Sequence, residues 1–122
     1  MNPQIEHALK TDGLIDITTI GAKSGKPHKI EIAFHNFDGV LYITGIPGKR
    51  DWYANLVAHP DFTFHLKQSA LADLAASATP ITDETTRKQV LSQVVVKWNR
   101  QAEIEKFMSS SPLVRVQLAD AA

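Results

Sequence analysis

The sequence predicts a mainly β protein with helices (α+β), in which antiparallel strands curl into a small barrel with a short inserted helix and late covering helices. Three observations support this fold class. Five or six short segments alternate apolar and polar residues between turn signals. One segment with helical spacing, near residues 52–57, interrupts them. The chain also lacks both the strand–helix alternation of a doubly wound sheet and a G-x-G-x-x-G motif, which argues against a Rossmann-type nucleotide site.

Length and composition indicate one cytoplasmic domain over residues 1–122, large enough to bury a core without disulfides or metal. The absence of cysteine excludes a disulfide framework, a thiolate zinc site and a cysteine nucleophile. The 13 basic residues balance 13 acidic ones, which argues against a dedicated nucleic-acid binder. No apolar run is long enough for an integral membrane segment, and residues 1–10 do not resemble a signal peptide.

Strands are predicted first at residues 14–20, about 28–35 and 40–44, with the sequence NFDG at 36–39 as the turn before the third. A helix is then predicted from a cap near Asp51 to a stop at His59-Pro60.

The second half continues with a strand at 62–67 and its alanine-rich partner at 70–78, which Pro80 ends. Thr82 and Asp83 start a helix with apolar residues at helical spacing up to Trp98. A shorter helix is expected at about 100–108, and 113–118 forms the closing strand.

The turn between the first two strands is the first candidate site. Gly21 and Gly25 permit unusual backbone angles, and donors gather around them in Lys23, Ser24, Lys26 and His28. Exposed main-chain N–H groups beside cationic side chains can bind a phosphate or a carboxylate. The alternative is an ordinary hairpin tip whose lysines face water.

The loop and helix start at residues 45–56 form the second candidate site. Gly48, Lys49 and Arg50 precede the predicted helix, whose N-terminus attracts anions. Trp52 offers a flat surface for a ring system, and Asn55 lies one turn after the start of the helix. Burial in the core remains an equal alternative for these two side chains, and it is the preferred interpretation for the neighbouring Tyr53 and Leu56.

Other chemistry finds little support in the sequence. The five histidines include no pair at metal-binding spacing on one helix, so no metal site is expected. His35 and His65 are predicted on outward strand faces, as solvent-facing or hydrogen-bonded side chains. A G-x-S-x-G motif is absent, so hydrolysis is not indicated, and the catalytic residues remain unknown.

The two candidate sites together resemble the deazaflavin-dependent nitroreductase family. These proteins are split β-barrels of the flavin/deazaflavin oxidoreductase superfamily, related to pyridoxamine-phosphate oxidase. The resemblance rests on TTIGAKSGKP at 18–27 and on WYANL at 52–56 followed by His59-Pro60, and it continues over nearly all of the chain.

The resemblance implies an oxidoreductase that transfers a hydride between reduced deazaflavin (coenzyme F420) and a small-molecule acceptor such as a quinone or nitro compound. It assigns cofactor binding to Lys23, Ser24, Lys26, His28, Gly48, Lys49, Arg50, Trp52 and Asn55. The tyrosines that family reductases carry near the late helix are not evident here. Two alternatives therefore stay open: a non-catalytic protein that binds flavin, haem or an apolar ligand, and an FMN-dependent reductase of the same fold.

A homodimer is expected as well, because split barrels of this kind generally pair. The predicted contact surface consists of Val40, Tyr42, Val94, Val95 and Trp98. The competing interpretation is that the late helices cover this face within one chain.

Overall fold

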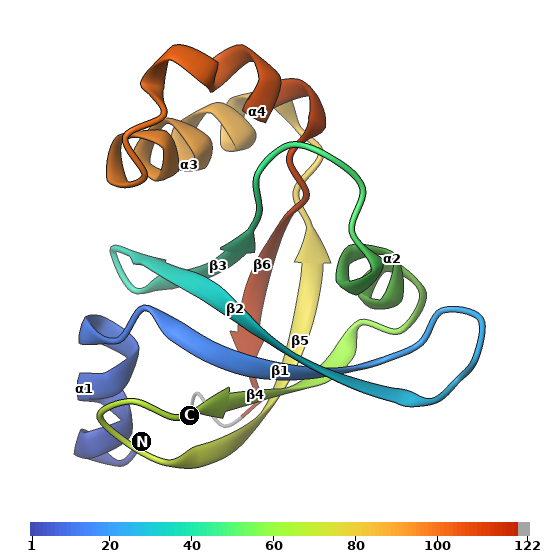
Figure 1. Ribbon diagram of the computed structural model, residues 1–122. Coiled ribbons are helices and arrows are strands. Elements are labelled where there is room, and N and C mark those ends of the chain that lie inside the picture. The colour runs from blue at the N-terminus through green and yellow to red at the C-terminus, as the bar shows by residue number, and fades with distance from the viewer. Residues whose placement is uncertain (120–122) are drawn as a thin grey trace.

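The computed structural model describes residues 1–119, and in it six antiparallel strands close into a barrel in the order β1-β2-β3-β6-β5-β4 (Figure 1). The strands are β1 Leu14–Ile20, β2 Pro27–Phe37, β3 Val40–Thr44, β4 Asp61–Leu66, β5 Ala72–Pro80 and β6 Leu113–Leu118. The helices are α1 Pro3–Thr11, α2 Asp51–Ala58, α3 Glu84–Lys97, η1 Gln101–Glu103 and α4 Ile104–Ser110. The predicted α+β barrel is confirmed. The last three residues of the expected domain lie outside the described part.

The strand predictions hold to within a few residues, and three of them match the observed bounds. The β2–β3 hairpin turns at Asp38 and Gly39, whose φ angles of 56° and 87° are those of the two-residue turn that fits the twist of a hairpin. The Asn36 side chain accepts the Gly39 N–H, which stabilises this turn. Only the alanine-rich strand starts later than expected, at Ala72.

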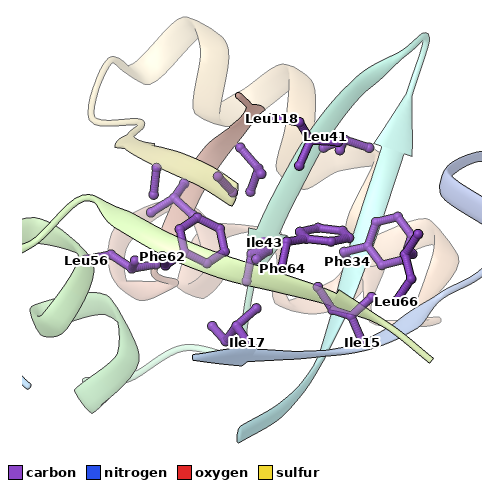
Figure 2. Close-up of a cluster of buried hydrophobic side chains, with 14 of the residues drawn as sticks. Ile15, Ile17, Phe34, Leu41, Ile43, Leu56, Phe62, Phe64, Leu66 and Leu118 are labelled. Carbon is purple, nitrogen blue, oxygen red and sulfur yellow. The ribbon is translucent and has the colours of Figure 1, made fainter. Parts of the chain in front are cut away.

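The barrel interior holds the main hydrophobic core (Figure 2). Alternate residues of every strand point inward, among them the fully buried Ile15, Ile17, Phe34 and Phe64. The Phe34 and Phe64 rings meet edge to face with centroids 5.3 Å apart. From outside the barrel, α2 adds Leu56, which is fully buried as the sequence predicted.

One helix was not predicted, and the start of another lies within one residue of the predicted cap near Asp51. Helix α1 was not expected, although Asn2 caps it and Pro3 occupies its first position, a recognised start signal. Helix α2 is capped by Arg50 without a side-chain hydrogen bond, so Asp51 lies in its first turn and is not its cap. The start of α3 is confirmed, because Asp83 accepts the N–H of Thr86.

Helices α3 and α4 lie together across one end of the barrel (Figure 1) and enclose a second cluster of apolar side chains. Val94 and Val95 are buried in it, while Tyr42 and Trp98 are half-buried against it. The predicted dimer surface is therefore wrong, because these late helices cover that face within the chain. Of its five residues, only Val40 remains exposed, at 37%.

The same helices change the environment of His35. Its side chain points away from the barrel interior, as predicted, but it is 1% exposed because α3 covers it. The ring stacks on Phe37 and contacts Trp98, with centroids 5.6 and 5.3 Å away. Burial, with a contribution from the Lys97 charge, lowers the pKa of His35 to about 4. His65 fits the prediction better, since it hydrogen-bonds Thr18 and Asp73 on the outer sheet face.

Among residues 1–119, no helix is long and apolar enough to cross a membrane.

Candidate functional site

The β1–β2 connection is a compact turn held by its own main chain. The Gly21 N–H donates to the Lys26 carbonyl at 2.8 Å, and the Gly25 N–H donates to the Gly21 carbonyl at 3.0 Å. Gly25 has a φ of 68°, a conformation that glycine adopts without strain. The hydroxyl of Ser24 accepts the Lys26 N–H at 3.2 Å and so closes the turn from the inside.

Gly21 is the tightest position of this turn. A Cβ there would lie 2.3 Å from Ser24 Oγ and 2.9 Å from His28 Nε2. Any side chain would displace Ser24 and His28, two of the residues assigned to the site. Glycine therefore lets the serine and the histidine pack over the end of β1.

Asn55 joins this turn to α2. Its Oδ1 accepts the Ala22 N–H at 2.9 Å, and its Nδ2 donates to Thr19 Oγ1 at 3.0 Å. The side chain is 92% buried, since its relative exposure is 8%. Both the oxygen and the nitrogen of the Asn55 amide thus form hydrogen bonds within the protein, and these bonds orient the turn relative to α2.

Between the turn and α2 lies a cavity of about 490 Å³. Its walls include Lys23, Ser24, His28, Trp52 and Asn55. Trp52 is only 7% exposed and packs into the barrel core, which confirms the core interpretation. It also borders this cavity, and its contact with a ring system stays a prediction. This volume is within the usual range for a small-molecule pocket, about 300–1,000 Å³.

The β3–α2 loop holds the second group of predicted residues. Gly48 has a φ of 130°, and its N–H donates to the Ser110 carbonyl at the end of α4, at 3.0 Å. The Arg50 guanidinium folds back onto the loop and donates to the carbonyls of Lys49 and Ile46, at 2.8 and 3.2 Å. The loop is therefore braced both internally and against α4.

This loop borders a separate cavity of about 670 Å³. Gly48, Lys49, Arg50 and Tyr53 form one side of it, and the segment 108–112 with Arg87 forms the other. The residues predicted to bind the cofactor therefore line two different cavities, which meet the first turn of α2 from opposite sides. Trp52 borders the smaller cavity and Tyr53 the larger one. Lys26 lines neither of these two cavities.

The larger cavity carries more cationic than acidic side chains, while the smaller one has one lysine and one acid. Lys23 and Asp51 both line the smaller cavity, where His28 adds a ring nitrogen that can form a hydrogen bond. Lys49, Arg50 and Arg87 face Glu84 in the larger one. The N-terminus of α2 adds its partial positive charge between them. An elongated anionic ligand with an apolar ring is the chemistry that this arrangement favours.

Sequence reasoning missed Arg87 and the segment at the end of α4. Arg87 follows Asp83 by one helical turn beside Lys88, and no local pattern separates the two cations. The Ser111 hydroxyl is buried and has no hydrogen-bond partner among residues 1–119. The sequence suggested only a helix end at this serine cluster, and that end is observed.

Comparison with known families finds one matching model. The model of the F420H(2)-dependent quinone reductase family covers residues 1–118. No curated protein sequence matches the chain significantly.

Solved structures share the fold at low sequence identity. A pyridoxamine 5'-phosphate oxidase homologue from Listeria innocua superposes with a TM-score of 0.71, 11% identity and 97% coverage of both chains. HutZ, a haem storage protein from Vibrio cholerae, gives 0.72 and 16% identity, covering 98% of this chain and 91% of its own. The F420-H2 dependent reductase FDR-A gives 0.62 and 20% identity, covering 87% of this chain and 95% of its own.

Proposed function

Because the chain belongs to the F420H(2)-dependent quinone reductase family, we propose that it is an oxidoreductase that binds coenzyme F420 along the two cavities beside α2. When bound, the reduced deazaflavin supplies a hydride to a quinone, nitro compound or related acceptor. The observation that carries the proposal is the pair of cation-lined cavities on either side of one helix turn.

The residues present fit the coenzyme, which combines an apolar ring system with an anionic tail. Lys23 supplies positive charge at the smaller cavity, His28 adds a ring nitrogen and Ser24 adds a hydroxyl. Trp52 supplies an apolar wall beside them. Lys49 and Arg50 continue the positive charge into the larger cavity. Charge-assisted hydrogen bonds to phosphate or carboxylate groups are roughly twice as strong as neutral ones, so this donor set favours the tail.

The tail would lie along Lys49 and Arg50 on the near side of the larger cavity, and we assign the acceptor to its far side, which is built from α4 and its end. Met108 and the segment 109–112 form this wall, and Tyr53 lies on the opposite side. Hydride transfer between cofactor and acceptor needs no protein nucleophile. The residues of the chain bind, orient the two reactants and exclude water, while the cofactor carries the redox chemistry.

A non-catalytic binding protein remains the second candidate. HutZ, which has a similar fold, is a haem storage protein. The family reductases carry tyrosines near the late helix, whereas Tyr53 on α2 is the one tyrosine at the larger cavity here, and this difference favours binding without turnover. An FMN-dependent reductase is a variant of the first proposal, in which a shorter anionic tail would occupy the smaller cavity alone.

We also propose a homodimer. Two exposed apolar side chains support it, Ile30 on β2 and Val57 on α2, with exposures of 37% and 56%. Their two elements border the smaller cavity, so a partner docked there would also shield the cofactor.

Tryptophan fluorescence tests the cofactor. The chain has two tryptophans, Trp52 and Trp98, so a Trp98→Phe variant reports from Trp52 alone. Titration with F420 is expected to quench this signal, and FMN is expected to quench it less. Anaerobic mixing of the F420H2 complex with menadione should then reoxidise the cofactor. F420 binding without reoxidation by quinone or nitro acceptors would favour the non-catalytic candidate, and FMN binding without F420 binding would favour a flavin protein.

A further inference from the structure

The Arg87 side chain forms more hydrogen bonds than any other side chain among residues 1–119. Its guanidinium donates to four main-chain carbonyls, those of Ile81, Phe107, Met108 and Ser111, at 2.8–3.2 Å. An arginine has five N–H donors in a planar fork, so one side chain can join carbonyls from separate segments. Here it joins the β5–α3 connection to the last turn of α4.

The position of this guanidinium also suits the electrostatics of α4. The last carbonyls of a helix lack partners within the helix, and they carry a partial negative charge. Met108 contributes such a carbonyl, and the Phe107 carbonyl beside it already accepts the Ser111 N–H; Arg87 brings a cation to both. The end of α4 is therefore held in one place by a residue on α3.

The end of α4 in turn holds the candidate cofactor loop. The Ser110 carbonyl accepts the Gly48 N–H at 3.0 Å. Lys49 and Arg50 follow directly, and all three loop residues line the larger cavity. Arg87 is thus connected to the loop through its hydrogen bond to the Ser111 carbonyl, the adjacent residue Ser110 and the Ser110–Gly48 hydrogen bond.

We propose that Arg87 is a positioning residue for the loop 48–50, acting through the end of α4 and the Ser110–Gly48 hydrogen bond. The expected effect of Arg87 on cofactor and acceptor binding rests on the proposed function. Its role in positioning the loop 48–50 is independent of that function. Lysine cannot replace it, because a single ammonium has three donors at one point and cannot reach all four carbonyls of the two segments.

Amide hydrogen exchange of the cofactor-free protein, read by NMR, tests the hold on the loop. In Arg87→Met, exchange of the Gly48 amide should accelerate about tenfold, the effect of losing roughly one hydrogen bond. Arg87→Lys should accelerate it as well and carries the test if Arg87→Met fails to fold. Lys88→Met removes the neighbouring cation and should leave this amide unchanged. The β1 amides of Ile15 and Ile17 should keep their wild-type rates in all three variants.

Two results would overturn the proposal: an unchanged Gly48 rate in Arg87→Lys, or acceleration of Gly48 together with the β1 amides, which would mean general destabilisation. The functional part is measured by F420 titration and by the KM of menadione. The Kd of F420 and the KM of menadione should each rise about tenfold in Arg87→Lys and stay constant in Lys88→Met. If the wild type binds no F420, the proposed function fails, while the exchange rates still decide the role of Arg87 in positioning the loop.

Discussion

Asn55 on α2 accepts the main-chain N–H of Ala22 through its Oδ1 at 2.9 Å, a contact between residues 33 positions apart. The same amide donates to the buried Thr19 hydroxyl, so one side chain connects the end of β1, the β1–β2 turn and α2. The wall of the smaller cavity depends on this connection, which makes Asn55 the first position to vary.

Asn55→Ala should lower the free energy of unfolding by about 1–3 kcal/mol, because it leaves a buried hydroxyl and an N–H without partners. It should also weaken F420 binding by releasing the turn. Asn55→Asp keeps an acceptor for the Ala22 N–H but places a carboxylate on the wall of the smaller cavity, so it should weaken binding of the anionic F420 at least as much as Asn55→Ala. Gln93→Ala, at an exposed amide on α3, is the matched control. Urea unfolding and fluorescence titration measure both effects; equal F420 affinity in all variants would contradict the orienting role.

Variants of Lys23 and Lys26 distinguish between two interpretations of the β1–β2 turn, a cofactor site and a solvated hairpin tip. Lys23 lines the smaller cavity and Lys26 does not. Lys23→Met should weaken F420 binding by about 1–3 kcal/mol at low salt, as expected for a charge-assisted hydrogen bond. The loss should shrink as salt is added, since exposed charges are screened.

Lys26→Met removes the same charge three residues further along the turn and should have the smaller effect. The readout is the Kd of F420 measured across a salt series. Equal losses in both variants would mean a general electrostatic attraction, and no loss in either would leave the turn as a hairpin tip.

His35 should make stability depend on pH. Its folded-state pKa of about 4 lies below the ordinary 6.5, so between these values the unfolded chain binds more protons than the folded one. The stability of the neutral, buried ring is fully present above pH 6.5 and is lost as the pH falls toward 4. The loss is up to about 3 kcal/mol.

His35→Leu fills the same site between Phe37 and Trp98 without a titrating group. Its stability should vary less over this pH range than that of the wild type. Urea unfolding at pH 4.5 and 7 compares the two proteins. Parallel pH profiles for the wild type and His35→Leu would show that other groups cause the dependence.

Ile30 and Val57 test the proposed dimer. Replacing either with glutamate places a charge on an exposed apolar side chain, so the folded monomer should survive while association weakens. Light scattering over a dilution series should give a dimer for the wild type and a larger monomer fraction for Ile30→Glu and Val57→Glu. A wild-type mass of 13.5 kDa at every concentration would exclude the dimer.

Local chemistry was sufficient to predict several elements. The strands 14–20, 40–44 and 113–118 were predicted with their observed bounds, because a half-buried strand alternates apolar and polar residues. The start of α3 followed from the capping chemistry of Asp83. The α+β barrel was predicted from the number of strands and the inserted helix. Helix α1 could have been predicted in the same way from Asn2 and Pro3.

Only the tertiary structure decided how these elements close and what they enclose. Pairing of β1 with β4 and of β3 with β6 joins segments far apart in the chain, and strand patterns do not specify their partners. His35 and Val94 are both buried because α3 packs over one end of the barrel. Arg87 and the two cavities follow from the same packing. Backbone propensity and capping act within a few residues, whereas burial and cavity walls depend on contacts between distant segments, and a single sequence does not encode these locally.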